Sequence, residues 1–115
     1  MKKIPVIMSL AAAFTAFTAS AVDDAQYQSI VRLGELNGIA LHCKYVDQTR
    51  RMKKAMIASL PKRRALGYAF DDETNKSFLN FIEKKQSCPA AHAFVRQVDE
   101  AIADLRQSFS GTTRR

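Results

Sequence analysis

Hydrophobic residues recur along most of the chain at intervals of three and four positions, which is the spacing of a helix with one buried face. Sustained alternation of hydrophobic and polar residues, which would indicate β-strands, is almost absent. The pattern predicts helices at residues 24–43, 45–60, 71–85 and 89–109, with a short helical piece at residues 62–70. We therefore expect an all-α fold, a small bundle of four to five helices.

The first predicted helix is hydrophobic on two sides. One side carries the stripe Tyr27, Ile30, Val31, Gly34, Gly38 and Leu41, and the other carries Leu33, Leu36, Ala40 and Cys43. A helix that is apolar on two faces belongs at the centre of a bundle. Gly34 and Gly38, one turn apart, would let a neighbouring backbone approach closely. Alternatively, the pair Asn37-Gly38 ends the helix.

Residues that favour helix ends lie close to the predicted boundaries. Asp23 or Asp24 is expected to cap the first helix, and Pro61 to end the second. The acidic residues at 71–73 suit the positive end of a helix dipole, so they are expected to begin a new helix.

The last predicted helix has the clearest hydrophobic stripe. Ser87 or Cys88 is expected to cap it, with Pro89 at its first position. The residues expected to face the core are Phe94, Val98, Ala101, Ile102, Leu105 and Phe109. Because these six residues lie three or four positions apart, they fall on one face of the helix.

The N-terminal 21 residues have the three parts of a secretory signal peptide. Lys2 and Lys3 precede a hydrophobic run, and the small residues at 19–21 form a cleavage site. The pattern predicts export to the periplasm, or secretion beyond it. Residues 22–115 are then expected to form a single helical domain, with residues 110–115 as a frayed tail.

The chain contains two cysteines, Cys43 and Cys88. In an oxidising compartment, a single pair predicts one disulfide that clamps the bundle. A metal site is the alternative, because His42 and His92 lie near the two cysteines and could complete a ligand set. Adjacent residues on a helix point about 100° apart, so His42 and Cys43 are poorly placed for one ion. We expect the disulfide, no bound metal and no cofactor.

Motifs that indicate catalysis are not found in the sequence. It has no nucleophile elbow, no glycine-rich phosphate loop and no zinc-protease motif. A cysteine nucleophile would need a reduced thiol, which the expected disulfide removes. We therefore expect a protein that is not an enzyme.

Positive charge is concentrated in residues 44–64. This segment holds eight basic residues and one acidic residue, and its net charge of +7 equals that of the whole chain. The remainder of the mature chain is slightly acidic. On a helix, most of these bases lie away from the Met52–Met56 side. The residues expected to form a binding surface are Arg50, Arg51, Lys53, Lys54, Lys62, Arg63 and Arg64.

A basic surface of this kind can bind an acidic protein, anionic lipid or nucleic acid, or it can serve solubility alone. Clustered charge of one sign steers association, which favours an acidic protein as the partner. Anionic lipid or lipopolysaccharide is an alternative. Nucleic acid is disfavoured because no exposed aromatic residues interleave with the bases for stacking. The simpler explanation is a solvated helix face that aids solubility.

The predictions converge on a periplasmic interaction protein. In size, export, helical content and expected disulfide, the chain is similar to small helical immunity proteins, which neutralise toxins, and to small periplasmic acid-stress chaperones. These resemblances rest on architecture and assign no residue a role. The first implies one specific partner; the second implies that apolar surface is exposed in acid. The oligomeric state is not predicted.

Overall fold

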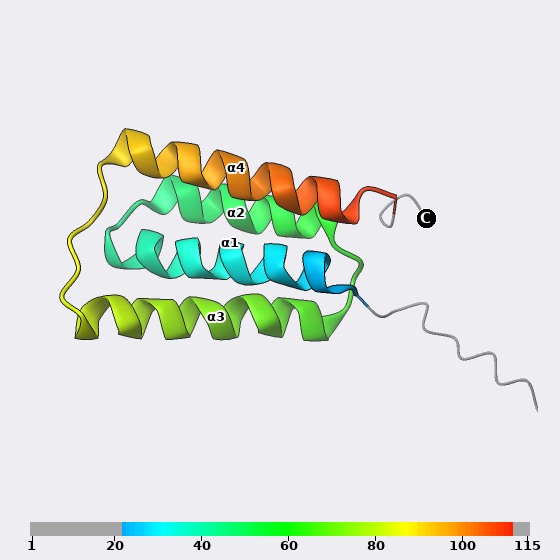
Figure 1. Ribbon diagram of the computed structural model, residues 1–115, viewed down its shortest axis with the longest axis horizontal. Helices are drawn as coiled ribbons and strands as arrows, with labels where there is room; N and C mark the ends of the chain where they lie inside the picture. Colours follow the sequence, from blue (N-terminus) through cyan, green and yellow to red (C-terminus); the bar gives the residue numbers. More distant parts are fainter. Residues whose placement is uncertain (1–21, 112–115) are drawn as a thin grey trace, which may run out of the picture.

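A computed structural model describes residues 22–111, and these contain four α-helices and no strand. The helices are α1 (Asp24–His42), α2 (Val46–Ser59), α3 (Arg64–Glu83) and α4 (Ala91–Phe109). Successive helices run in opposite directions (Figure 1). The predicted all-α fold with one disulfide is confirmed, and the number of helices is four. The predicted signal peptide and residues 112–115 of the predicted tail lie outside the described part of the chain.

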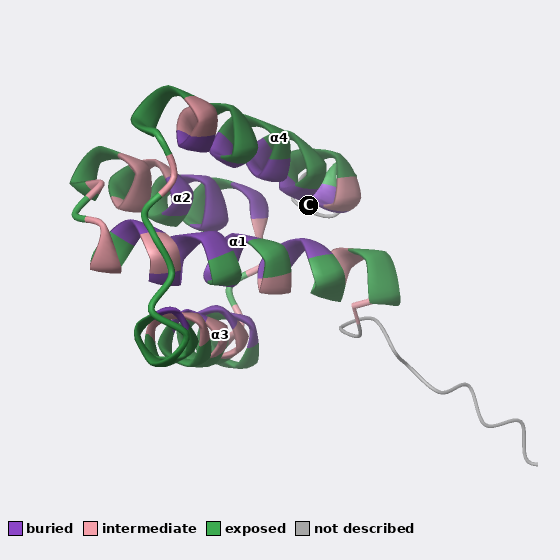
Figure 2. Cartoon of the chain, turned by 60° about the vertical axis from the view of Figure 1, so that its left-hand side comes forward, coloured by how far each residue is buried: buried purple, intermediate pink, exposed green. Residues whose placement is uncertain are grey.

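Helix α1 lies at the centre of the fold, as its two hydrophobic faces predict. It packs against each of the other three helices, and α2 also packs against α4. The backbone of α3 lies close to that of α1 alone among the helices. Figures 1 and 2 show α3 on the side of α1 opposite α4. In the fold, α1, α2 and α4 therefore pack against one another, and α3 packs on the far side of α1.

The hydrophobic core joins the inward faces of all four helices. Each buried leucine, isoleucine, methionine or phenylalanine contributes roughly 1.5–3 kcal/mol relative to its exposed state. All six residues of the stripe predicted for the last helix are buried. Tyr27 and Leu41, assigned by sequence to a hydrophobic stripe of α1, are instead exposed. The core cluster is formed by Ile30, Leu33, Leu36, Ala40, Met52, Ala55, Met56, Leu66, Phe70, Phe94, Val98, Ala101, Ile102, Leu105 and Phe109.

The contact between α1 and α3 is built on two glycines. A Cβ added to Gly34 would lie 2.9 Å from the Phe70 carbonyl oxygen, and one added to Gly38 would lie 2.6 Å from the Thr74 carbonyl oxygen. Neither distance leaves room for a side chain. The predicted close approach is confirmed. The alternative that the helix ends at Gly38 is wrong, because α1 continues to His42.

Hydrogen bonds cross the same contact. The Asn37 side-chain amide donates to the Thr74 hydroxyl at 3.2 Å, and that hydroxyl donates to the Phe70 carbonyl at 2.8 Å. The Ser77 hydroxyl donates to the Glu35 carbonyl of α1 at 2.6 Å. Because these polar side chains are short, they satisfy hydrogen bonds without pushing the two helices apart.

The predicted start of the first helix and the predicted end of the second agree with the structure, whereas two other predicted helix starts do not. Asp23 caps α1 in a capping box with Gln26, and α2 ends just before Pro61, as expected. The prediction that a new helix begins at residues 71–73 is wrong. Helix α3 is already continuous from Arg64, because residues 64–70 place Leu66 and the following core positions on the same buried face.

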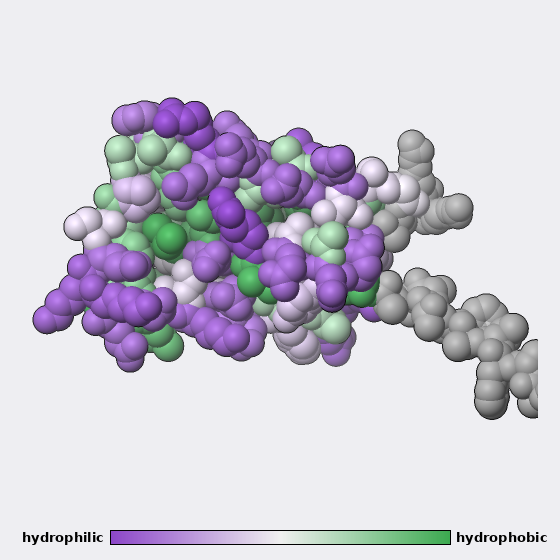
Figure 3. Space-filling view, in the orientation of Figure 1, coloured by the Kyte–Doolittle hydropathy of each residue, from purple (hydrophilic) through white to green (hydrophobic). Residues whose placement is uncertain are grey.

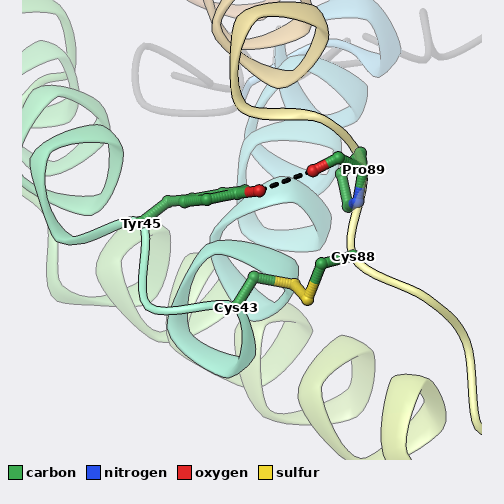
Figure 4. The surroundings of a disulfide bond; sticks show 4 residues. All are labelled: Cys43, Tyr45, Cys88 and Pro89. Atoms are coloured by element: carbon green, nitrogen blue, oxygen red, sulfur yellow. Dashed lines mark hydrogen bonds between the residues drawn. A yellow bond between two sulfur atoms is a disulfide. The ribbon is translucent and has the colours of Figure 1, made fainter.

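The predicted start of the last helix is also wrong. Its N-cap is Ala90, and residues 86–90 are extended rather than helical. The extended chain is fastened to the corner between α1 and α2. Cys88 forms the disulfide with Cys43, and the Tyr45 hydroxyl donates a hydrogen bond to the Pro89 carbonyl (Figure 4). These two attachments hold the crossover from α3 to α4 across the end of the bundle.

Candidate functional site

The basic residues predicted to bind a partner lie on the outward side of α2 and on the corner that follows it. The buried residues of α2, among them Met52 and Met56, face the core. Residues 50, 53 and 54 are therefore on the exposed side. Lys62 and Arg63 follow in the connection, and Arg64 is the first residue of α3.

Two of the predicted binding residues are engaged within the protein. Arg50 forms an ion pair with Asp47 at 3.0 Å on the surface of α2. Arg51 is partly buried, pairs with Asp99 of α4 at 2.7 Å and also donates to Gln48 at 2.8 Å. Arg51 therefore joins α2 to α4, and its charge is partly neutralised.

Of the seven predicted binding residues, four are exposed and form no ion pair with any described residue: Lys53, Lys54, Lys62 and Arg64. We call these four residues the basic patch. Arg63, partly buried, lies between two of them in sequence. A cation that has no internal partner is free to pair with an acidic group from outside.

A hydrophobic residue lies among these cations and was not predicted to be exposed. The Ile57 side chain is 77% exposed, the highest value among the large hydrophobic residues of the described chain. Lys53 and Lys54 precede it by four and three positions, so all three lie on one side of α2. The sequence held a signal for this, because position 57 is about 100° away from the core residue Met56 around the helix axis.

Ile57 also borders a groove of about 350 Å³ where α2 turns into α3. Two of the lining residues, Met56 and Leu66, belong to the hydrophobic core. Lys62 and Arg63 supply the charged part of the lining, and no acidic residue takes part. The full lining is Met56, Ile57, Leu60, Pro61, Lys62, Arg63, Leu66 and Gly67. We call this the corner groove.

Three larger grooves have a different character. One of about 720 Å³ lies between α1 and α4 and contains one basic residue, Arg32, and two acidic residues, Glu35 and Asp104. Another, of about 690 Å³ between α1 and α3, contains Lys76 with three glutamates, Glu35, Glu73 and Glu83. A third, of about 450 Å³ on α3, contains Asp71 and Asp72. On the face drawn in Figure 3, hydrophilic residues cover most of the surface and hydrophobic residues show mainly in the hollow between them. None of these three grooves gathers basic groups around an apolar base.

The residues considered for a metal site are not assembled into one. Both cysteines form the disulfide. The His42 ring lies against Phe78 and Phe81, with centroid distances of 5.7 and 4.9 Å. His92 is exposed on α4. Within residues 22–111, no group of three or more histidine, cysteine or acidic residues could hold a metal ion.

Comparisons with known proteins give no relative from which a function could be transferred. No protein-family model, curated protein or solved structure matches the chain. None of the helices in the described residues is long and apolar enough to cross a membrane. The functional argument therefore depends on the surface itself.

Proposed function

We propose that this is an exported interaction protein that binds an acidic protein through the basic patch. The observation that carries the proposal is the set of four exposed cations without an internal ion pair, gathered on α2 and the corner after it. Such a cluster accelerates encounter with an acidic surface and selects against basic ones. A protein that inhibits or neutralises one acidic partner is the concrete form of this function.

Export to the periplasm is part of the proposal. The signal-peptide pattern at residues 1–21 supports it, and so does the disulfide between Cys43 and Cys88, because such bonds persist in oxidising compartments. The basic patch would then meet other exported proteins or proteins of the cell envelope.

The test is capture of partners from an envelope extract by three forms of the immobilised mature protein. The first is wild type, and the second carries Lys53→Glu, Lys54→Glu and Lys62→Glu. Arg51 is left unchanged because its pair with Asp99 supports the fold. We expect a defined acidic protein to be retained by wild type and lost from this charge-reversed variant.

The third form is a control with the same change in net charge. It carries Lys84→Glu, Lys85→Glu and Arg96→Glu, which alter exposed basic residues outside α2 and the corner that follows it. We expect the control to retain the partner, and titration of the two purified proteins would then confirm binding. Identical sets of captured proteins for all three forms would contradict the proposal.

A further inference from the structure

The corner groove lies directly beside the basic patch. Lys62 belongs to both, and Lys53 and Lys54 lie one turn of α2 away from the groove residue Ile57. Arg64 follows the groove residue Arg63 in the chain. A ligand seated in the groove would therefore have positive charge on several sides and no acidic lining residue against it.

The interior of the groove is apolar, and its size suits a side chain. Met56, Leu60, Pro61 and Leu66 contribute hydrophobic surface, and the exposed Ile57 extends this surface to the rim. A dry cavity of about 150 Å³ accommodates a benzene ring. A groove of about 350 Å³ thus has room for one aromatic or branched aliphatic side chain.

We infer that the corner groove receives a large apolar side chain from an acidic segment of the partner protein, while the acidic residues on either side of that side chain pair with the basic patch. The inference rests on the proposed function and adds the type of segment that is recognised. Binding energy in protein interfaces concentrates where an apolar anchor fills a pocket inside a charged rim. The charges would accelerate association with the partner, and the apolar side chain in the groove would supply much of the binding energy.

A protein segment fits the site better than a lipid or a nucleic acid. The lining contains no aromatic residue on which a base could stack. Membrane-surface helices present a broad apolar face, whereas the inward side of α2, including Met52 and Met56, is buried in the core. What remains outside is one short groove with charge on its rim.

The inference is tested with short random peptides displayed in a library and selected on the intact mature protein. We expect the selected peptides to be acidic and to share a large apolar residue. Synthetic copies would then be titrated by fluorescence anisotropy. Replacing their shared apolar residue with serine should weaken binding about tenfold or more, as expected for an anchor residue.

A groove-blocking variant separates the groove from the charge. Gly67 lines the groove, and a Cβ at this position would meet no atom within 4 Å, so Gly67→Leu adds a side chain there without crowding the core. We expect Gly67→Leu to keep the thermal stability of wild type and to bind the selected peptides about tenfold or more weakly. Ile57→Ser removes part of the hydrophobic rim of the groove and should also weaken binding of the selected peptides.

The possible outcomes distinguish the inference from the proposed function. Unchanged peptide binding by Gly67→Leu, together with loss of binding by the charge-reversed variant, would overturn the groove assignment and leave the proposed function standing. Selection of no acidic peptide would also overturn the groove assignment, and capture from the envelope extract would decide the proposed function separately. Binding of wild type and Gly67→Leu to phosphatidylglycerol vesicles is the last measurement. Vesicle binding that Gly67→Leu abolishes, without peptide binding, would assign the groove to lipid and overturn the inference.

Discussion

Gly38 of α1 and Ser77 of α3 are so close that a Cβ added to the glycine would lie 2.6 Å from both the Cβ and the hydroxyl oxygen of the serine. This relationship explains how α3 is attached. Its backbone lies close to that of α1 alone among the helices, so the α1–α3 interface is its main attachment. Small residues on both helices bring the backbones close enough for hydrogen bonds to cross between them.

Replacing Gly38 with alanine should therefore separate α1 from α3. The new methyl group would meet the backbone oxygen of Thr74 as well as Ser77, and the backbone cannot move without shifting the helix. We expect Gly38→Ala to lower the free energy of unfolding by about 1–3 kcal/mol, which is typical of overpacking. Gly34→Ala should do the same to a smaller degree, because its nearest contact is longer, at 2.8 Å to the Glu73 Cβ. Chemical denaturation followed by circular dichroism measures both effects.

Gly67→Ala is the matched control for these two variants. Gly67 is also inside a helix, but a Cβ there would have no neighbour within 4 Å. Alanine favours a helix over glycine by about 1 kcal/mol, so this variant should be as stable as wild type or more stable. Equal losses of stability at all three glycines would show that helix packing is not the cause.

The buried hydrogen bond between Asn37 and Thr74 is the second determinant of the α1–α3 contact. Asn37 is 1% exposed, and its side-chain oxygen has no partner in the described structure, so the bond from its amide to Thr74 is the one that it makes. Thr74→Val keeps the shape of the side chain and removes the acceptor. We expect a loss of about 1–3 kcal/mol in unfolding free energy, the cost of leaving a buried polar group unsatisfied.

Ser108→Ala provides the comparison for Thr74→Val. The Ser108 hydroxyl also donates to the carbonyl four residues earlier, that of Asp104, but this bond is exposed to solvent. Its loss should change stability by less than about 0.5 kcal/mol. If the two variants cost the same, burial of the Asn37 amide would not be the cause.

Much of the fold could be predicted from hydrophobic spacing. The central position of α1 follows from its two apolar faces, and the stripe on α4 is buried in full. These predictions succeed because burial of a helix face imposes a regular period on the sequence. The close approach of a neighbouring helix at the glycines could also be predicted, since Gly34 and Gly38 lie one turn apart on α1.

The boundaries near residues 71 and 89 could not be predicted because tertiary contacts override local preference there. Acidic residues favour helix starts, yet Leu66 and Phe70 continue one buried face and hold α3 helical through that region. Proline favours the first helical turn, yet the disulfide and the Tyr45 hydroxyl hold Pro89 in an extended segment.

The sequence located the concentration of charge but not which cations are free. Arg51 is separated from Asp99 by 48 positions, so its ion pair depends on how α2 packs against α4. The corner groove likewise requires α2 and α3 to meet at Pro61, which spacing within one helix cannot reveal. Whether the surface binds a partner stays a prediction.

The disulfide and Tyr45 should stabilise the same crossover jointly. Replacing both Cys43 and Cys88 with serine opens a loop of 45 positions, for which chain entropy gives a loss of about 4 kcal/mol. Tyr45→Phe removes the hydrogen bond to the Pro89 carbonyl and keeps the ring that packs on Phe94 at 5.3 Å, so it should cost about 1 kcal/mol.

Denaturation of the single, double and triple variants tests this coupling. If both attachments restrain one segment, the effect of Tyr45→Phe should differ between the oxidised protein and the protein without the disulfide. Strict additivity would contradict a shared role. Unfolding of the wild type with and without reductant is the control. A similar loss of stability on reduction would show that the effect of the cysteine variants comes from the lost disulfide and not from the introduced serines.

The exposed Ile57 should contribute almost nothing to stability, in contrast to its neighbours on α2. Its side chain is 77% exposed, so Ile57→Ala should change the free energy of unfolding by less than about 0.5 kcal/mol. Met52, on the same helix, is fully buried, and Met52→Ala should cost about 2–5 kcal/mol through lost contacts and the cavity left behind. Thermal and chemical unfolding of the two variants measure the difference. A large loss of unfolding free energy for Ile57→Ala would mean that the residue supports the fold. Its position beside the basic patch would then be explained by stability and not by binding. A negligible loss would leave the side chain available for binding.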